Sequence, residues 1–258
     1  MLRMTALASV LALIAGTAMA EDIKVGVSPG EHAEIMEEVA KVAAPKGLNI
    51  KVVEFSDYVV PNQALNDGDI DANSFQHKPY LDNQIKDRGF DLVEVGTTIT
   101  TPMGVYSSKI KDLKDLKDGA TVGIPNDPTN GGRALLVLQQ LGLIKVDAAA
   151  GLKPTVIDIT ENAKKLKFQE LDAAQLPRSL KDLDAALINT NYAIASGLNP
   201  KTDAIAMESA ENPYVNIIVV KKGNEDKPWV KTLVESYHSD DVKKFIEDKY
   251  HGTVLTSW

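Results

Sequence analysis

The sequence has 258 residues, a formal net charge of −8 at pH 7 and no cysteine. The absence of cysteine excludes disulfides, thiol catalysis and cysteine-based metal sites. The acidic balance argues against nucleic acid and anionic membranes as partners, which leaves small molecules and other proteins. The length is sufficient for one large or two modest domains.

The first twenty residues have the pattern of a secretory signal peptide. Arg3 supplies a positive start, residues 6–15 form an apolar run, and Ala18-Met19-Ala20 is a small-residue cleavage site. We therefore expect cleavage between Ala20 and Glu21 and export to the periplasm. Because Glu21 follows the cleavage site and the chain has no cysteine for lipid attachment, we also expect a freely diffusing protein without a membrane anchor, not a lipoprotein.

From residue 23 onwards, short apolar strands alternate with amphipathic helices. We expect strands over 23–27, 48–55, 69–72 and 91–95, and helices over 31–44, 58–66 and 79–88. This alternation of strand and helix predicts a parallel sheet covered by helices.

A second α/β unit follows from residue 100. Its expected strands are 100–107, 121–124, 155–159, 168–171 and 185–188, with a charged helix over 112–119 and a central helix that ends near Gly142. The chain then returns through a strand over 214–221 and two closing helices, 228–238 and 240–250.

This order predicts a bilobed periplasmic-binding-protein fold of the α/β class, with two lobes joined by two crossover strands. We assign residues 1–20 to the signal peptide, 21–102 and 211–258 to lobe I, and 103–210 to lobe II. Ligand sites in such folds lie in the cleft between the lobes, near the carboxyl ends of the strands.

The stretch PNDPTNGGRALL, residues 125–136, is predicted to join a strand to the central helix. Thr129 or Asn130 is expected to cap the helix, and Gly131-Gly132 leaves backbone N–H groups of the first turn open to an anion. Arg133, one turn in, can hold a carboxylate through two parallel hydrogen bonds. The alternative is an arginine that is merely solvated.

Two asparagines lie at strand ends of the predicted lobes. Asn189 follows the strand 185–188, and Asn216 lies near the start of the strand 214–221. An amide oxygen accepts a hydrogen bond from an ammonium group without adding charge, so both residues together with Arg133 predict a site for a zwitterionic α-amino acid. A turn or cap role is the alternative for each asparagine.

Aromatic and imidazole side chains gather between residues 55 and 80, although aromatic residues make up only 5% of the chain. Such a group can form the wall of an apolar pocket and contact a thioether sulfur. The alternative is an ordinary core cluster, to which Phe55 in particular is suited. The residues are Phe55, Tyr58, Phe75, His77 and Tyr80.

Four long motifs occur in order along the chain: DYVVPNQALNDGDIDANSFQHKPYLDNQIKDRGF, IPNDPTNGGRALLVLQQLGLI, QLPRSLKDLDAALINTNYA and NPYVNIIVV. They resemble the NlpA/MetQ family of methionine-binding proteins of ABC transporters, and the resemblance runs from about residue 23 to 258. It implies the bilobed fold and delivery of methionine to an inner-membrane importer. The positions that match the family's ligand contacts are Tyr58, Phe75, His77 and Tyr80 around the thioether, Arg133 at the carboxylate, and Asn189 and Asn216 at the amino-acid backbone.

We therefore predict a monomeric binding protein that captures L-methionine or a close analogue and docks transiently on a membrane ABC permease. A methionine-containing dipeptide or another apolar amino acid is the alternative ligand, and a structural or adhesion role without a ligand is a further alternative. An enzyme is not expected, because His77 with Asp71 and Ser74 forms no recognisable catalytic arrangement. The four histidines lie far apart in sequence, so neither a metal site nor a cofactor is predicted.

Overall fold

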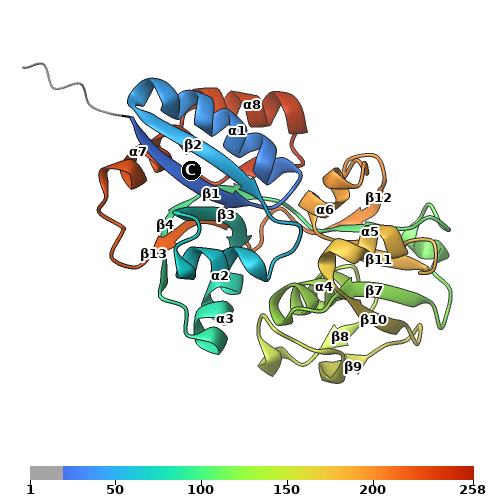
Figure 1. Cartoon of the computed structure of the whole chain (residues 1–258). Coiled ribbons are helices and arrows are strands. Elements are labelled where there is room, and N and C mark those ends of the chain that lie inside the picture. The colour runs from blue at the N-terminus through green and yellow to red at the C-terminus, as the bar shows by residue number, and fades with distance from the viewer. Residues whose placement is uncertain (1–19) are drawn as a thin grey trace, which may run out of the picture.

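Two five-stranded sheets organise the chain, one in each lobe (Figure 1). The structure is a computed structural model that describes residues 20–258, so the predicted signal peptide lies outside the described residues apart from Ala20. The predicted bilobed α/β fold is confirmed. No helix within the described range is long and apolar enough to cross a bilayer.

The first sheet has the strand order β2-β1-β3-β13-β4. β1 pairs in parallel with β2 and β3, whereas β13 runs antiparallel between β3 and β4. The bounds are β1 Glu21–Val27, β2 Leu48–Glu54, β3 Ala72–His77, β4 Leu92–Thr97 and β13 Asn216–Lys221.

Helices cover both faces of this sheet (Figure 1). One face packs against α1 (Glu31–Ala43), α7 (Pro228–Tyr237) and α8 (Asp240–Tyr250), and the other against α2 (Val60–Asp67) and α3 (Lys78–Arg88). α1 buries Ile35 and Val39, which are four residues apart and lie on one face of the helix.

The second sheet has the strand order β10-β7-β11-β6-β12, with β6 antiparallel to both of its neighbours. Its strands are β6 Gly104–Tyr106, β7 Thr121–Pro125, β10 Lys167–Leu171, β11 Ala185–Ile188 and β12 Ala204–Met207. The helices of this lobe are α4 Pro128–Gln140, α5 Leu176–Ser179 and α6 Thr190–Ala195. A separate hairpin joins β8 (Lys145–Val146) to β9 (Ile159–Glu161).

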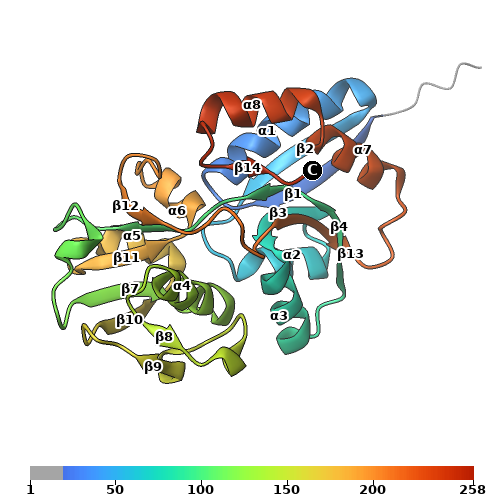
Figure 2. The same ribbon diagram turned by 180° about the vertical axis from the view of Figure 1, so that it is seen from behind.

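The chain crosses between the sheets twice (Figures 1 and 2). It leaves through β5 (Ile99–Thr100) and residues 101–103, and it returns through residues 208–215. β5 pairs with β14 (Leu255–Thr256), so the C-terminal segment lies against the first crossing. The lobe boundaries at residues 102/103 and 210/211 stay a prediction.

Several predicted elements differ from the structure. The strand expected at 69–72 is β3, Ala72–His77. It is fully buried although several of its residues are polar, because Asn73 and Gln76 hydrogen-bond to each other and to Asn62 in the interior. The helix expected at 112–119 is only a 3-10 turn, Leu113–Asp115, because its lysines and aspartates leave too narrow an apolar face to bury.

Two further strand predictions were wrong at their starts. Residues 156–158 form a 3-10 turn before β9, because Thr155 and Asp158 make a reciprocal capping box. The strand expected from Tyr214 begins at Asn216, because the Tyr214 N–H donates to the Asn212 side chain in a turn. The remaining 3-10 turns are Ala44–Lys46, Ala148–Ala150 and Ala173–Gln175.

Candidate ligand-binding site

All seven predicted site residues line one cavity between the two lobes. The lining encloses about 320 Å³ of empty space, part of which is open to solvent. Whether these residues bind a ligand stays a prediction. The lining residues are His32, Tyr58, Phe75, Gln76, His77, Tyr80, Thr101, Asn130, Arg133, Asn189, Asn191 and Asn216.

The start of α4 is capped differently from the prediction. Asp127 is the N-cap, and its Oδ1 accepts from the backbone N–H of Thr129 at 3.2 Å and of Asn130 at 2.9 Å. Pro128 occupies the first helical position, which fixes the start of the helix before Thr129 and Asn130. The predicted anion site at this helix start is therefore wrong, because the Asp127 carboxylate already occupies it.

Gly131 and Gly132 serve packing instead of anion binding. A Cβ on Gly131 would lie 2.8 Å from the Pro125 oxygen, and one on Gly132 would lie 2.8 Å from the Leu152 oxygen. The Gly131 N–H donates to the Asp127 carbonyl at 2.8 Å. The two glycines let α4 approach the end of β7 and the 152–153 backbone closely.

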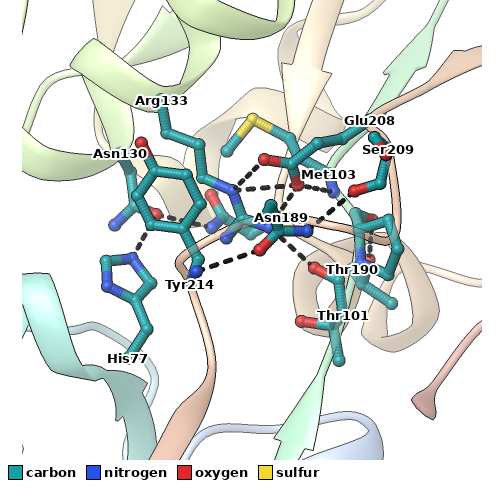
Figure 3. Close-up of polar contacts among 12 residues, drawn as sticks. His77, Thr101, Met103, Asn130, Arg133, Asn189, Thr190, Glu208, Ser209 and Tyr214 are labelled. Atoms are coloured by element: carbon teal, nitrogen blue, oxygen red, sulfur yellow. Dashed lines mark hydrogen bonds and ion pairs between the residues drawn. The ribbon is translucent and has the colours of Figure 1, made fainter. Parts of the chain in front are cut away.

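Arg133 is 2% exposed and forms a buried ion pair with Glu208 (Figure 3). Its Nε donates to the two Glu208 carboxylate oxygens at 3.0 and 3.1 Å, and its Nη2 donates to the Thr101 carbonyl at 2.8 Å and to Glu208. The predicted pair of parallel bonds to a ligand cannot use this edge, which Glu208 already holds. Within residues 20–258, Nη1 makes no hydrogen bond and remains for a ligand.

Sequence reasoning missed Glu208 and Tyr214 beside Arg133. The ring of Tyr214 lies against the guanidinium, with its centroid 4.4 Å from Cζ. Glu208 directly follows β12, so the sequence signal that could have identified it was an acidic residue at the end of an apolar strand.

A chain of side-chain hydrogen bonds fixes the orientation of Asn189. The Asp127 carboxylate accepts from Asn130 Nδ2 at 3.0 and 3.1 Å, which turns Asn130 Oδ1 away to accept from Asn189 Nδ2 at 2.9 Å. Asn189 Oδ1 is buried and has no partner among the described residues. Asn216 is held similarly, since its Nδ2 donates to the Ile99 carbonyl at 3.2 Å. Both asparagines therefore keep an amide oxygen available as an acceptor.

His77 is a neutral structural bridge in the cavity wall. Its Nδ1 accepts from the Tyr80 N–H at 3.2 Å, and its Nε2 lies 3.2 Å from Asn130 Oδ1 (Figure 3). These two bonds require the proton on Nε2. Burial, and secondarily the charge of Arg133, lowers the pKa of His77 to about 3.

Tyr58, Phe75 and Tyr80 form the aromatic wall, with ring centroids 6.0 to 6.2 Å apart. Tyr192 of the second lobe adds a fourth ring, 4.9 Å from Tyr58. Phe55 does not line the cavity and packs against the core beneath α2 and α3. Tyr192 does not line the cavity either, so it supports the aromatic wall from the second lobe through its contact with Tyr58.

The two lobes are in contact around the cavity, as expected for a closed form. The Tyr58 hydroxyl donates to Asn191 Oδ1 at 2.5 Å, and Lys153 Nζ donates to Asn83 Oδ1 at 2.9 Å. Gly30 lies so close to Asn191 that an added Cβ would be 2.5 Å from the backbone carbonyl oxygen of Asn191. The part of the chain that the structure describes contains no cluster of three or more metal-ligating side chains.

Known protein families, sequences and solved structures that resemble this chain all point to one family. A family model described as NlpA lipoprotein matches residues 23–258. The chain is 52% identical over 239 residues to the D-methionine-binding lipoprotein MetQ of Escherichia coli K12, covering 92% of this chain and 88% of the relative. It also resembles the solved structure of a nutrient binding protein from Burkholderia cenocepacia bound to methionine, with a TM-score of 0.89, 55% identity, and 92% and 100% of the two chains covered. A periplasmic substrate-binding protein of an ABC transporter from Coxiella burnetii gives a TM-score of 0.87 at 44% identity, with 91% and 100% covered.

The expectation of a freely diffusing protein that is not a lipoprotein is wrong. The matched family is described as NlpA lipoprotein and the Escherichia coli relative is named a D-methionine-binding lipoprotein, and both findings contradict this expectation. The expectation rested on Glu21 and on the lack of cysteine. The lack of cysteine excludes a lipid attached through a cysteine thioether, but it does not by itself show that the protein diffuses freely.

Proposed function

Because the chain belongs to the NlpA lipoprotein family, we propose that it binds methionine in the inter-lobe cavity and delivers it to an ABC importer. One observation carries this proposal: the seven residues singled out for an amino-acid ligand all line one cavity between the lobes. The methionine-bound Burkholderia cenocepacia structure supports the same ligand. The predictions of the family and of a binding protein instead of an enzyme are confirmed.

The polar groups of the cavity complement a zwitterion. We place the ligand carboxylate at Nη1 of Arg133 and the ammonium at the free amide oxygens of Asn189 and Asn216. Glu208 compensates the charge of Arg133, and His77 is neutral, so the site adds little net charge to a ligand that has none. Because neither the site nor the ligand carries a net charge, binding avoids the large free-energy cost of burying an uncompensated charge.

The thioether side chain lies against Tyr58, Phe75 and Tyr80 in this arrangement. Burial of a methionine side chain supplies about 1.5–3 kcal/mol, while the polar contacts reject ligands without an amino-acid head. Sulfur–aromatic contacts with this wall favour methionine over an aliphatic side chain of equal length.

The closed contacts between the lobes connect ligand binding to transport. A ligand that touches both lobes stabilises the form in which they meet, and we propose that the membrane permease recognises this form. We also propose that the binding protein acts as a monomer.

Isothermal titration calorimetry tests the ligand. Protein that has been unfolded, dialysed free of bound ligand and refolded is titrated with L-methionine, and we expect a one-to-one isotherm with a Kd below about 1 μM. Asn189→Ala should weaken binding at least tenfold, whereas Asn199→Ala, which removes the same side chain outside the cavity, should not. A correctly refolded sample that gives no heat would contradict the proposal. Competition with D-methionine, norleucine and a methionine dipeptide then defines selectivity.

A further inference from the structure

His32 is a buried polar residue of the cavity that the sequence did not single out. It lies in the first turn of α1, is 4% exposed and lines the cavity. Its Nδ1 is buried and has no hydrogen-bond partner anywhere in residues 20–258. An unpaired polar atom in the interior is costly, so it calls for a partner that the protein itself does not supply.

Glu31, the neighbour of His32, lies on the Nε2 side of the imidazole ring. Glu31 Oε1 lies 3.8 Å from His32 Nε2, and both carboxyl oxygens of this fully buried residue lack a hydrogen-bond partner in the described part of the chain. A neutral carboxyl has one carbonyl oxygen, and with that oxygen facing Nε2 the tautomer with hydrogen on Nε2 is favoured. Nδ1 then presents a lone pair and is an acceptor.

Burial keeps both side chains neutral at pH 7. It lowers the pKa of His32 to about 4 and raises the pKa of Glu31 to about 8. His32 is therefore an uncharged imidazole that accepts a hydrogen bond without repelling a cation.

An ammonium group has three N–H donors, and the asparagine oxygens described above account for two of them. We propose that His32 Nδ1 is the third acceptor for the ammonium group of the bound amino acid, and that Glu31 is a positioning residue that holds the required tautomer. This inference rests on the proposed function. It makes the ammonium, and not the thioether alone, a condition for tight binding.

Calorimetry with two ligands tests the contact. L-methionine is compared with its des-amino analogue, which keeps the thioether and the carboxylate but has no ammonium. We expect His32→Ala to weaken methionine binding about tenfold or more and to leave binding of the analogue within about twofold of wild type. His32→Gln, which restores an acceptor oxygen, should recover most of the methionine affinity.

The outcomes separate this inference from the proposed function. If wild-type protein binds methionine and His32→Ala binds it equally well, or if His32→Ala weakens both ligands equally, the ammonium contact is overturned and the proposed function stands. If wild-type protein does not bind methionine, the proposed function itself fails.

Nitrogen NMR of the histidine rings tests the role of Glu31. The His32 signals are assigned by their loss in His32→Gln. Wild-type protein should show hydrogen on Nε2, and methionine should shift the Nδ1 resonance in the direction of an accepted hydrogen bond. Glu31→Leu, which removes the acceptor for the Nε2 proton, should raise the population of rings with hydrogen on Nδ1 and weaken methionine binding. A wild-type ring with hydrogen on Nδ1, or a tautomer population in Glu31→Leu equal to that of wild type, would overturn the positioning role.

Discussion

Arg133 forms a buried ion pair with Glu208 and, in the proposed function, holds the ligand carboxylate, and one pair of variants separates these two roles. Replacing Arg133 alone leaves the buried carboxylate of Glu208 without its partner. Removal of one member of a buried ion pair costs about 3–5 kcal/mol, so Arg133→Met should lower the free energy of unfolding by that amount. A loss of methionine affinity in this variant would therefore mix a damaged fold with a missing ligand contact.

The double variant Arg133→Met/Glu208→Gln removes both charges together. The glutamine oxygen can still accept the Met103 N–H, which donates to Glu208 Oε2 at 2.9 Å. We expect its stability to return to within about 2 kcal/mol of wild type, because a neutral replacement of a buried pair is often tolerated. Methionine binding should nevertheless stay weakened more than tenfold, since no cation remains for the carboxylate.

Urea unfolding without ligand and calorimetry with methionine measure the two quantities independently. If the double variant regains wild-type affinity, Arg133 does not hold the ligand carboxylate. If Arg133→Met alone is as stable as wild type, the reasoning about the buried pair is refuted.

Three further predictions concern lobe closure and pH. Gly30→Ala should weaken methionine binding at least tenfold in calorimetry, because the added Cβ would clash with the backbone carbonyl oxygen of Asn191. Gly68 has a similar positive φ and no atom within 4 Å of an added Cβ, so Gly68→Ala should leave the Kd unchanged. Tyr58→Phe removes the hydrogen bond to Asn191 and should raise the Kd about 2- to 10-fold. The pKa of Glu31 rises from 4.5 to about 8 on folding, so its contribution to stability is complete below about pH 4.5 and is lost as the pH rises to 8. Urea unfolding at about pH 5 and about pH 8 should show this loss in wild type and a smaller one in Glu31→Gln.

Apolar periodicity was sufficient to predict many regular elements of the core, but β12, α5 and α6 were not predicted. The strand 185–188 and the helix 240–250 were placed to the residue, since both have a clear apolar pattern and defined ends. β3 was misplaced because its buried residues are polar and satisfy one another, which no local pattern indicates.

The candidate site was predictable only in part. Residues at strand ends and in the aromatic cluster could be found from their positions in sequence. Glu208 could not, because its partner Arg133 lies 75 residues away. His32 was missed because the sequence does not determine which side of the first turn of α1 faces the other lobe.

The position of β13 in the first sheet has a consequence for how the protein is made. β13 lies between β3 and β4, yet it is separated from β4 by the whole of the second sheet along the chain. A ribosome or a translocation channel that releases the chain from its N-terminus therefore presents β3 and β4 with unpaired edges until residue 221 has emerged. The second sheet, whose strands lie within 104–207, is complete earlier. Vectorial synthesis should thus leave the first lobe unfinished until nearly the whole chain is available.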